Sequence, residues 1–387
     1  MKQEVQFLLN MIKYILNNHP GELPLPKADL NWEYLIHLAK RHSILNLVHY
    51  GIGRLPEEAK PSEGICKFAE KAAMHEIVKC YNQIEAVEEL LQACEKAGVS
   101  VLAVKGSCTK QHYPQPDMRS MGDIDLLYKW TEHDAMHKAV LDLGYEEGGE
   151  GRKHDHYFRP PYIGLEMHRE LVASDSEYVS YYEHIWDRLQ TRANCKHIYE
   201  MCREDEYIYS LIHLTEHFRQ GGIGIRFIMD VFVYNRMEHM DWNYIEVELK
   251  KLALWEFYGN ISRLAQMWFG ETGEFTAEEQ AITDKLATYI VENGTYGTQK
   301  NAAAISVAKG GRIAFLRDTV FPDLKNMQSM FPWLRKWPIL LPYSWILRGV
   351  RSVLFRRGNV KQQLAKYKTG DKEYGQELKQ FFQKCGL

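Results

Sequence analysis

The sequence lacks the features that define several classes of protein. No run of about 18 apolar residues occurs, so no membrane-spanning helix is predicted. The seven cysteines are scattered and include no CxxC pair, which favours reduced thiols over a disulfide or zinc framework. The formal net charge is only -3, so the surface as a whole does not attract polyanions. We therefore expect a cytoplasmic protein, with no strong case for nucleic-acid binding.

The sequence does contain enough apolar material for a large core, because 45% of its 387 residues are hydrophobic. Helical periodicity covers residues 1–96, whose amphipathic start carries Glu4 and has no signal-peptide pattern. Residues 97–172 show short strand patterns, and helical periodicity returns over 173–292. Residues 293–387 are basic and aromatic, and we expect them to be helical too. The predicted fold class is α+β, with a small mixed β-sheet core flanked by N-terminal and C-terminal helical domains.

Local patterns give the expected elements of this plan. Asn31 and Gly98 are predicted to begin and end helices of the first segment. In the core, residues 99–104 have the β-branched, apolar pattern of a buried strand. A second strand is expected over 123–129, and two further strands are separated by Pro160-Pro161. Additional helices are predicted over residues 133–144, 181–190, 204–222, 226–238, 244–269 and 277–294.

Acidic residues alternate with apolar ones in two of these strands. Alternate residues of a strand share a face, so Asp123 and Asp125 project together, as do Glu166 and His168. If the two strands are neighbours, three carboxylates converge and repel one another unless cations compensate. Carboxylate oxygens suit Mg²⁺ or Mn²⁺. Asp123, Asp125 and Glu166 are therefore the candidate metal ligands and catalytic residues.

The segment upstream adds positive charge and a glycine turn. Gly106-Ser107 follows the first strand and is expected to open a helix, where backbone N–H groups favour anions. Glycine permits close approach of a phosphate, and a serine hydroxyl can donate to it. Lys105 and Arg119 supply positive charge on either side. We predict that these four residues bind a triphosphate beside the metal ions.

The order of these motifs, VKGS followed by GDIDLL and then EMH, resembles that of the DNA polymerase β-type nucleotidyltransferase superfamily. More narrowly, the chain is similar to poorly characterised bacterial nucleotidyltransferases with helical flanking domains, over about residues 30–300. The resemblance implies metal-dependent transfer of a nucleoside monophosphate from an NTP, expected to be ATP, with release of pyrophosphate. Asp123 and Asp125 then hold two Mg²⁺ ions and Glu166 completes the site. One departure is the insertion between Gly106 and Asp123, which predicts an extra loop.

The resemblance also extends into the helices after the core. It implies that His217, Arg226 and Asp230 hold the nucleotide or its acceptor across the cleft. For Arg226 and Asp230, a simple i, i+4 ion pair is an equal alternative. The acceptor stays open among a small molecule, a protein side chain and an RNA end, the first two being favoured. An alternative function is a catalytically silent nucleotide-binding or regulatory module on the same fold.

Other histidines and acids offer alternatives to this site. Asp155 and Glu170 are rivals for the third carboxylate, but neither lies in so clear a strand pattern as Glu166. His154 and His156 share a strand face, for which we predict a structural or substrate-edge role, and His168 is expected to hydrogen-bond a carboxylate.

A remote alternative is a zinc metallopeptidase. Residues 213–217, HLTEH, match H-x-x-E-H, in which His213 and His217 could share zinc.

The last segment has a charge bias of its own. Residues 324–370 hold ten lysines and arginines and no acid, interleaved with tryptophans. Such a stretch could make weak contact with an anionic surface, whereas packing with exposed basic ends is the plainer interpretation.

Overall fold

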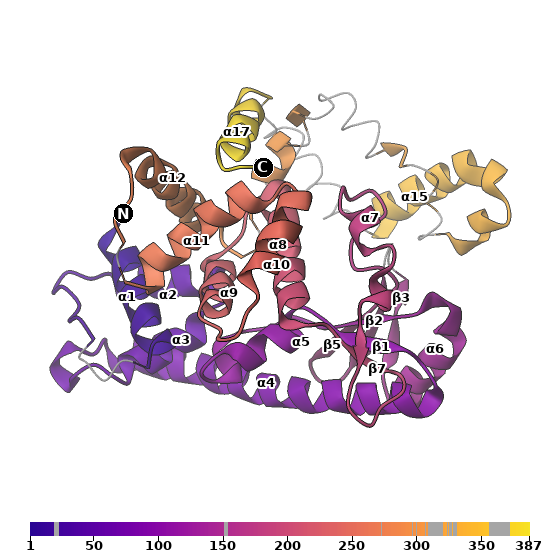
Figure 1. Cartoon of the computed structure of the whole chain (residues 1–387), viewed down its shortest axis with the longest axis horizontal. Coiled ribbons are helices and arrows are strands. Elements are labelled where there is room, and N and C mark those ends of the chain that lie inside the picture. Colours follow the sequence, from indigo (N-terminus) through magenta and orange to yellow (C-terminus); the bar gives the residue numbers. More distant parts are fainter. Residues whose placement is uncertain are drawn as a thin grey trace.

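The computed structural model describes most of the chain, and its arrangement is α+β as predicted (Figure 1). It has one mixed β-sheet, and helices from both the N-terminal and the C-terminal parts of the sequence pack around it. The described residues are 1–18, 23–150, 154–271, 273–295, 297–298, 300–305, 307–308, 320–322, 324, 327, 331–355 and 372–387.

Seven strands of the described residues form a single sheet in the order β3-β4-β5-β2-β1-β7-β6. The central pair β2–β5 and the pair β1–β7 are parallel, and the other neighbours are antiparallel. The bounds are β1 Val101–Ala103, β2 Ile124–Tyr128, β3 Glu146–Glu150, β4 His154–Arg159, β5 Ile163–His168, β6 Gln190–Thr191 and β7 Ile198–Glu200.

The helices lie before, within and after the sheet. The bounds of those described are α1 Gln3–Leu16, α2 Trp32–Arg41, α3 Leu45–Ile52, α4 Glu63–Ala97, α5 Gly106–Thr109, α6 His133–Asp142, α7 Val179–Tyr182, α8 Arg203–Gln220, α9 Ile225–Asn235, α10 Trp242–Lys251, α11 Trp255–Phe269, α12 Ala277–Asn293, α15 Leu341–Phe355 and α17 Lys372–Lys384. Helix α4 runs beneath both the N-terminal helices and the sheet (Figure 1).

Strand alternation gives the sheet one apolar face. Ile124, Leu126, Leu165 and Met167 are buried in a core shared with α4 and α6. Because side chains alternate along a strand, the residues between them project to the opposite face, which carries the candidate site. Helix α4, which packs on the apolar face, ends where predicted, at Gly98 with φ 72°.

A second core joins the N-terminal helices to those after the sheet. Leu8, Ile12, Tyr207, Phe218 and Phe269 are buried together in it, and they come from α1, α8 and α11. The N-terminal helices therefore pack against the later helices and stabilise them through apolar burial.

Two helix predictions differ from the structure. Residues 181–190 hold the end of α7, a 3-10 turn and strand β6 instead of one helix, because this segment pairs through β6 and β7 with the sheet edge. Residues 244–269 form α10 and α11, which are separated where Ala253 adopts φ 55°. In both places tertiary packing overrides a continuous helical pattern.

The C-terminal segment is only partly described. Helix α15 and the turns before it expose apolar side chains, among them Ile339, Tyr343 and Ile346. Residues 356–370 of the basic stretch lie outside the described residues, so surface contact there stays a prediction. Among the helices of the described residues, none has both the length and the apolar character needed to cross a membrane.

Candidate active site on the polar face of strands β2 and β5

The parallel register of β2 and β5 brings the candidate carboxylates together. It pairs Asp125 with Glu166, so these two acids are side by side on adjacent strands. Asp123 precedes β2 and lies over Gly164 of β5, since a Cβ atom there would be 2.0 Å from Asp123 Oδ1. The three acids predicted as metal ligands therefore occupy one face of the sheet.

Lys105 contacts one of these acids directly. Its Nζ lies 2.5 Å from Asp125 Oδ1, and both side chains are almost wholly buried. Burial alone would raise the pKa of Asp125, but Lys105 and then His168 hold it well below its usual range. Lys105 adopts φ 54°, a left-handed conformation that is unfavourable for a residue with a side chain. The prediction assigned Lys105 to a phosphate, whereas here its ammonium group contacts Asp125.

A buried histidine connects the two paired acids. His168 Nε2 lies 2.8 Å from Asp125 Oδ1 and 3.2 Å from Glu166 Oε2. This is the hydrogen-bonding position expected for His168. Burial would raise the pKa of Glu166, but the hydrogen bond from His168 lowers it below its usual range. Asp125 and Glu166 are consequently held ionised.

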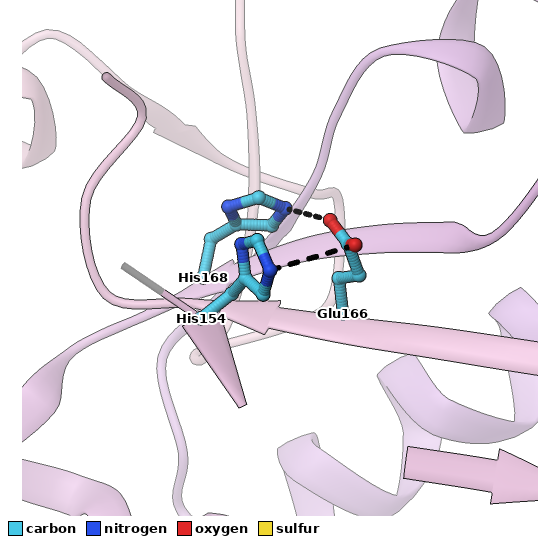
Figure 2. Close-up of side chains that lie close together, drawn as sticks. All are labelled: His154, Glu166 and His168. Carbon is cyan, nitrogen blue, oxygen red and sulfur yellow. Dashed lines mark ion pairs between the residues drawn. The ribbon is translucent and has the colours of Figure 1, made fainter. Parts of the chain in front are cut away.

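Two more histidines enter from the neighbouring strand β4. The antiparallel register pairs His154 with His168 and His156 with Glu166. His154 Nε2 lies 3.5 Å from Glu166 Oε1, and Figure 2 shows the His154 and His168 rings side by side and directed at Glu166. Burial and then the nearby His168 lower the pKa of His154 to about 4. The alternation of histidines in β4 was visible in the sequence, but its registry with β5 was not.

Asp123 differs from the other two acids. Burial and then the negative charges of Glu166 and Asp125 raise its pKa above the usual value. Its side chain is exposed, while that of Asp125 is buried. Asp123 therefore lies where solvent reaches the cluster, and Lys79 and His156 offset only part of the repulsion from the other two acids.

The Gly106-Ser107 turn packs tightly against the loop that follows it. A Cβ atom on Gly106 would lie 2.5 Å from Arg119 Nη1 and 2.7 Å from Met121 Sδ, so only glycine fits. Ser107 is 5% exposed. It lines, with Lys105 and Tyr209, a cavity of about 450 Å³ between α4, β1 and α8.

Arg119 and Asp230 form a separate buried ion pair. Arg119 Nη2 lies 2.9 Å from Asp230 Oδ2, and Tyr113 Oη donates to Asp230 Oδ1 at 2.6 Å. Arg226 reaches the same loop by donating to the Ser120 carbonyl at 2.5 Å. These residues fix the inserted loop onto α9. The structure therefore pairs Asp230 with Arg119, a contact that neither interpretation of Asp230 anticipated.

The alternative motifs lie elsewhere. Asp155 projects to the opposite face, where it accepts a hydrogen bond from Tyr128 at 3.0 Å. His213 and His217 of α8 have ring centroids 4.4 Å apart, and the His217 ring lies 5.7 Å from that of Phe227. Among the described residues, one group of three potential ligands is close enough to share an ion, and it consists of His154, Glu166 and His168.

Comparison with known proteins identifies the family. A family model described as an uncharacterised nucleotidyltransferase matches residues 28–270, which is more than half of the chain. The chain belongs to this family. The predicted resemblance is thereby confirmed at the level of a nucleotidyltransferase-type family. The matched residues of this nucleotidyltransferase-family protein include strands β2, β4 and β5, and therefore their whole polar face. Searches of the curated proteins and of the solved structures give no match.

Proposed function

We propose that the chain transfers a nucleoside monophosphate from an NTP, expected to be ATP, to an acceptor hydroxyl with release of pyrophosphate. The observation that carries the proposal is the parallel register that places Asp125 beside Glu166, with Asp123 next to them over Gly164. Membership of a nucleotidyltransferase family supports the reaction class. A small molecule or a protein hydroxyl is the favoured acceptor.

The donor set fits a divalent cation. Asp123 reaches solvent, but the partial burial of its carboxylate and then repulsion by Glu166 and Asp125 raise its pKa, which indicates an excess of negative charge. Asp123, Asp125 and Glu166 supply the oxygen ligands that Mg²⁺ or Mn²⁺ prefers. When bound there, such a cation would neutralise phosphate charge and acidify the acceptor hydroxyl.

The residues of the chain have distinct roles in this proposal. Lys105 and His168 keep Asp125 ionised and fix its position. Glu166 completes the ligand set, and we assign to it the role of accepting the proton of the acceptor hydroxyl. The hydroxyl oxygen forms a bond to the α-phosphorus, and the bond from that phosphorus to the β-phosphate oxygen breaks. Pyrophosphate leaves with the electron pair of the broken bond.

A cytoplasmic location is part of the same proposal. The seven cysteines are all free, as expected in the reducing compartment where NTPs are abundant.

One observation favours the alternative of a silent nucleotide-binding module. Asp125 Oδ1 already contacts the Lys105 ammonium group and His168, so the chain itself supplies positive charge to this acid. A cation arriving at Asp125 must compete with Lys105. A module that binds nucleotide without transfer would show this arrangement as well.

Label transfer distinguishes these functions. The protein is incubated with α-labelled NTPs, Mg²⁺ or Mn²⁺ and a cell extract, and wild type is compared with Asp125→Ala and Asp123→Asn. Asp134→Ala, an exposed acid on α6, is the matched control. We expect labelled product with wild type and the control, and at least about a hundredfold less with the two site variants.

Two outcomes would contradict the proposal. Label transfer that survives in Asp125→Ala places the reaction elsewhere in the protein. Nucleotide binding without transfer by any of the variants or the wild type supports the silent module.

A further inference from the structure

Three side chains on β4 and β5 form a ligand set of a different kind from the carboxylates. Donor atoms of His154, Glu166 and His168 all lie within 4.8 Å of one another. Glu166 and His168 are alternate residues of one strand, and His154 is the cross-strand partner of His168. The three side chains thus come from two adjacent strands of a sheet, which holds their positions firmly (Figure 2).

We propose that His154, Glu166 and His168 form a binding site for a borderline divalent cation of the Zn²⁺ or Co²⁺ type. This site goes beyond the proposed nucleotidyl transfer, because it needs neither nucleotide nor acceptor. Two imidazoles and one carboxylate are a donor set that suits Zn²⁺, whereas Mg²⁺ favours oxygen ligands alone.

The distances between the donor atoms also match the spacing of ligands around an ion, although His168 Nε2 is within hydrogen-bond distance of Glu166 and of Asp125. His168 Nε2 lies 3.2 Å from Glu166 Oε2, and His154 Nε2 lies 3.5 Å from Glu166 Oε1. Hydrogen bonds between N–H and oxygen are usually about 2.7–3.2 Å long. Ligands that are about 2.0–2.1 Å from a tetrahedral ion lie about 3.3–3.4 Å apart. The two observed separations fall on either side of that tetrahedral edge.

Burial also favours a ligand at this place. His168 is fully buried and His154 is largely buried, so few water molecules compete with an ion for their ring nitrogens. The Nε2 atoms of both rings are directed at Glu166 (Figure 2). An ion between the rings would take the Nε2 lone pair of each neutral imidazole, whose single N–H would then lie on Nδ1.

Lys105 explains why the imidazole set can be separate from the acids on β2. Its ammonium group lies 2.5 Å from Asp125 Oδ1 and offsets the charge of that acid. Glu166 is then the carboxylate that contacts both His154 and His168. Because Glu166 also belongs to the proposed Mg²⁺ ligands, the two kinds of ion share one side chain.

Metal binding to the full-length protein tests this site without any activity assay. Zn²⁺ affinity is measured by competition with a chromophoric chelator, and Co²⁺ binding by its visible absorption. We expect about one equivalent of either ion, with the absorption of a four-coordinate Co²⁺ centre. His154→Ala and Glu166→Gln should each weaken Zn²⁺ binding by at least about tenfold. Circular dichroism checks that both variants are folded.

Two controls on the same chain make the result decisive. His217→Ala alters the other close histidine pair, that of the H-x-x-E-H motif, and should leave Zn²⁺ affinity unchanged. Asp123→Asn alters the exposed acid of the proposed Mg²⁺ site and should change it less than threefold.

Three results would overturn the proposal: absence of stoichiometric Zn²⁺ binding, binding that survives His154→Ala, and a loss in Asp123→Asn as large as that in His154→Ala. The last result would place the ion among the carboxylates. None of the three bears on whether label transfer depends on Asp125, so the two proposals fail separately.

Discussion

Two buried charged clusters of this protein differ in how completely their charges are matched. Between the inserted loop and α9, Asp230 accepts two hydrogen bonds from Arg119 and one from Tyr113. On the polar face of the sheet, Lys105 contacts Asp125, and His168 contacts both Asp125 and Glu166. Asp123 is exposed there, and the repulsion from the other two acids is only partly offset by nearby positive charge.

The buried histidines differ in the same way. His42 uses both ring nitrogens, because Nδ1 accepts from the Ile225 N–H at 3.1 Å and Nε2 lies 3.1 Å from the Val291 carbonyl. His154 and His168 each have a buried Nδ1 without a hydrogen-bond partner in the described part of the chain.

The comparison teaches how to separate structural charge from charge available to a ligand. A cluster whose donors and acceptors are all used stabilises the fold and has nothing left to bind with. A cluster with surplus acid gains from an added cation. By this criterion the loop–α9 contact is structural, and the face of β2, β4 and β5 is where we propose that ligands bind.

The largest effect is expected from breaking the structural cluster. Asp230→Ala leaves the Arg119 guanidinium buried without its counter-ion and should lower the free energy of unfolding by about 3–5 kcal/mol. Urea unfolding followed by circular dichroism measures the change. A loss below about 1 kcal/mol would show that the ion pair is not structurally important and would remove the contrast between the two clusters.

A smaller effect is expected from protonating His42. Burial and then Arg41 lower the pKa of His42 to about 4, so the unfolded chain takes up a proton first as the pH falls below about 6.5. His42 alone should therefore reduce the free energy of unfolding by about 2 kcal/mol between pH 7 and pH 5. Urea unfolding at both pH values measures it, and His42→Gln should show correspondingly less pH dependence. Equal pH dependence in the two proteins would contradict the structural role.

Adding a single methyl group at Gly164 sharpens the comparison on the site side. Gly164→Ala places Cβ 2.0 Å from the present position of Asp123 Oδ1, so the carboxylate must move. Because a flexible side chain can move easily, we expect a stability loss below about 1 kcal/mol but at least about tenfold less label transfer. Gly122→Ala is the matched control, since its Cβ would meet nothing within 4 Å. Equal transfer by both variants would show that the position of Asp123 is unimportant.

The smallest effect has the opposite sign. The raised pKa of Asp123 means that its ionisation opposes folding as the pH rises through that pKa. Asp123→Asn should therefore stabilise the protein at pH 7, by less than about 1 kcal/mol because the group is exposed and screened. Asp125→Asn, which breaks the buried contact with Lys105, should destabilise it. Urea unfolding of both variants measures these changes in the free energy of unfolding. A decrease in both variants would contradict this account.

Local sequence patterns predicted much of the fold. Asn31 caps α2 by accepting from the Tyr34 N–H, and Gly98 ends α4 in the left-handed conformation. The alternation around Asp125 and Glu166 correctly gave the apolar and polar faces of both strands. These features depend on a few adjacent residues, and so a single sequence contains them.

Contacts between distant segments were harder to predict. The Arg119–Asp230 pair joins positions 111 residues apart, and the nearest sequence pattern, Arg226 with Asp230 on one helix, suggested another partner. Strands β3, β6 and β7 were not predicted. Strands β6 and β7 are short, and β3 and β6 form the two edges of the sheet.

The sequence by itself determined which residues could form a carboxylate site and on which face of each strand they lie, since side-chain alternation is a local property of the backbone. Only the tertiary structure decided that β2 and β5 are parallel neighbours with Asp125 beside Glu166. Only the tertiary structure shows that His154 is the cross-strand partner of His168 and that Lys105 contacts Asp125. Strand register depends on the packing of the whole sheet. That packing places the Asp-x-Asp motif in one cluster with Glu166, the histidines and Lys105.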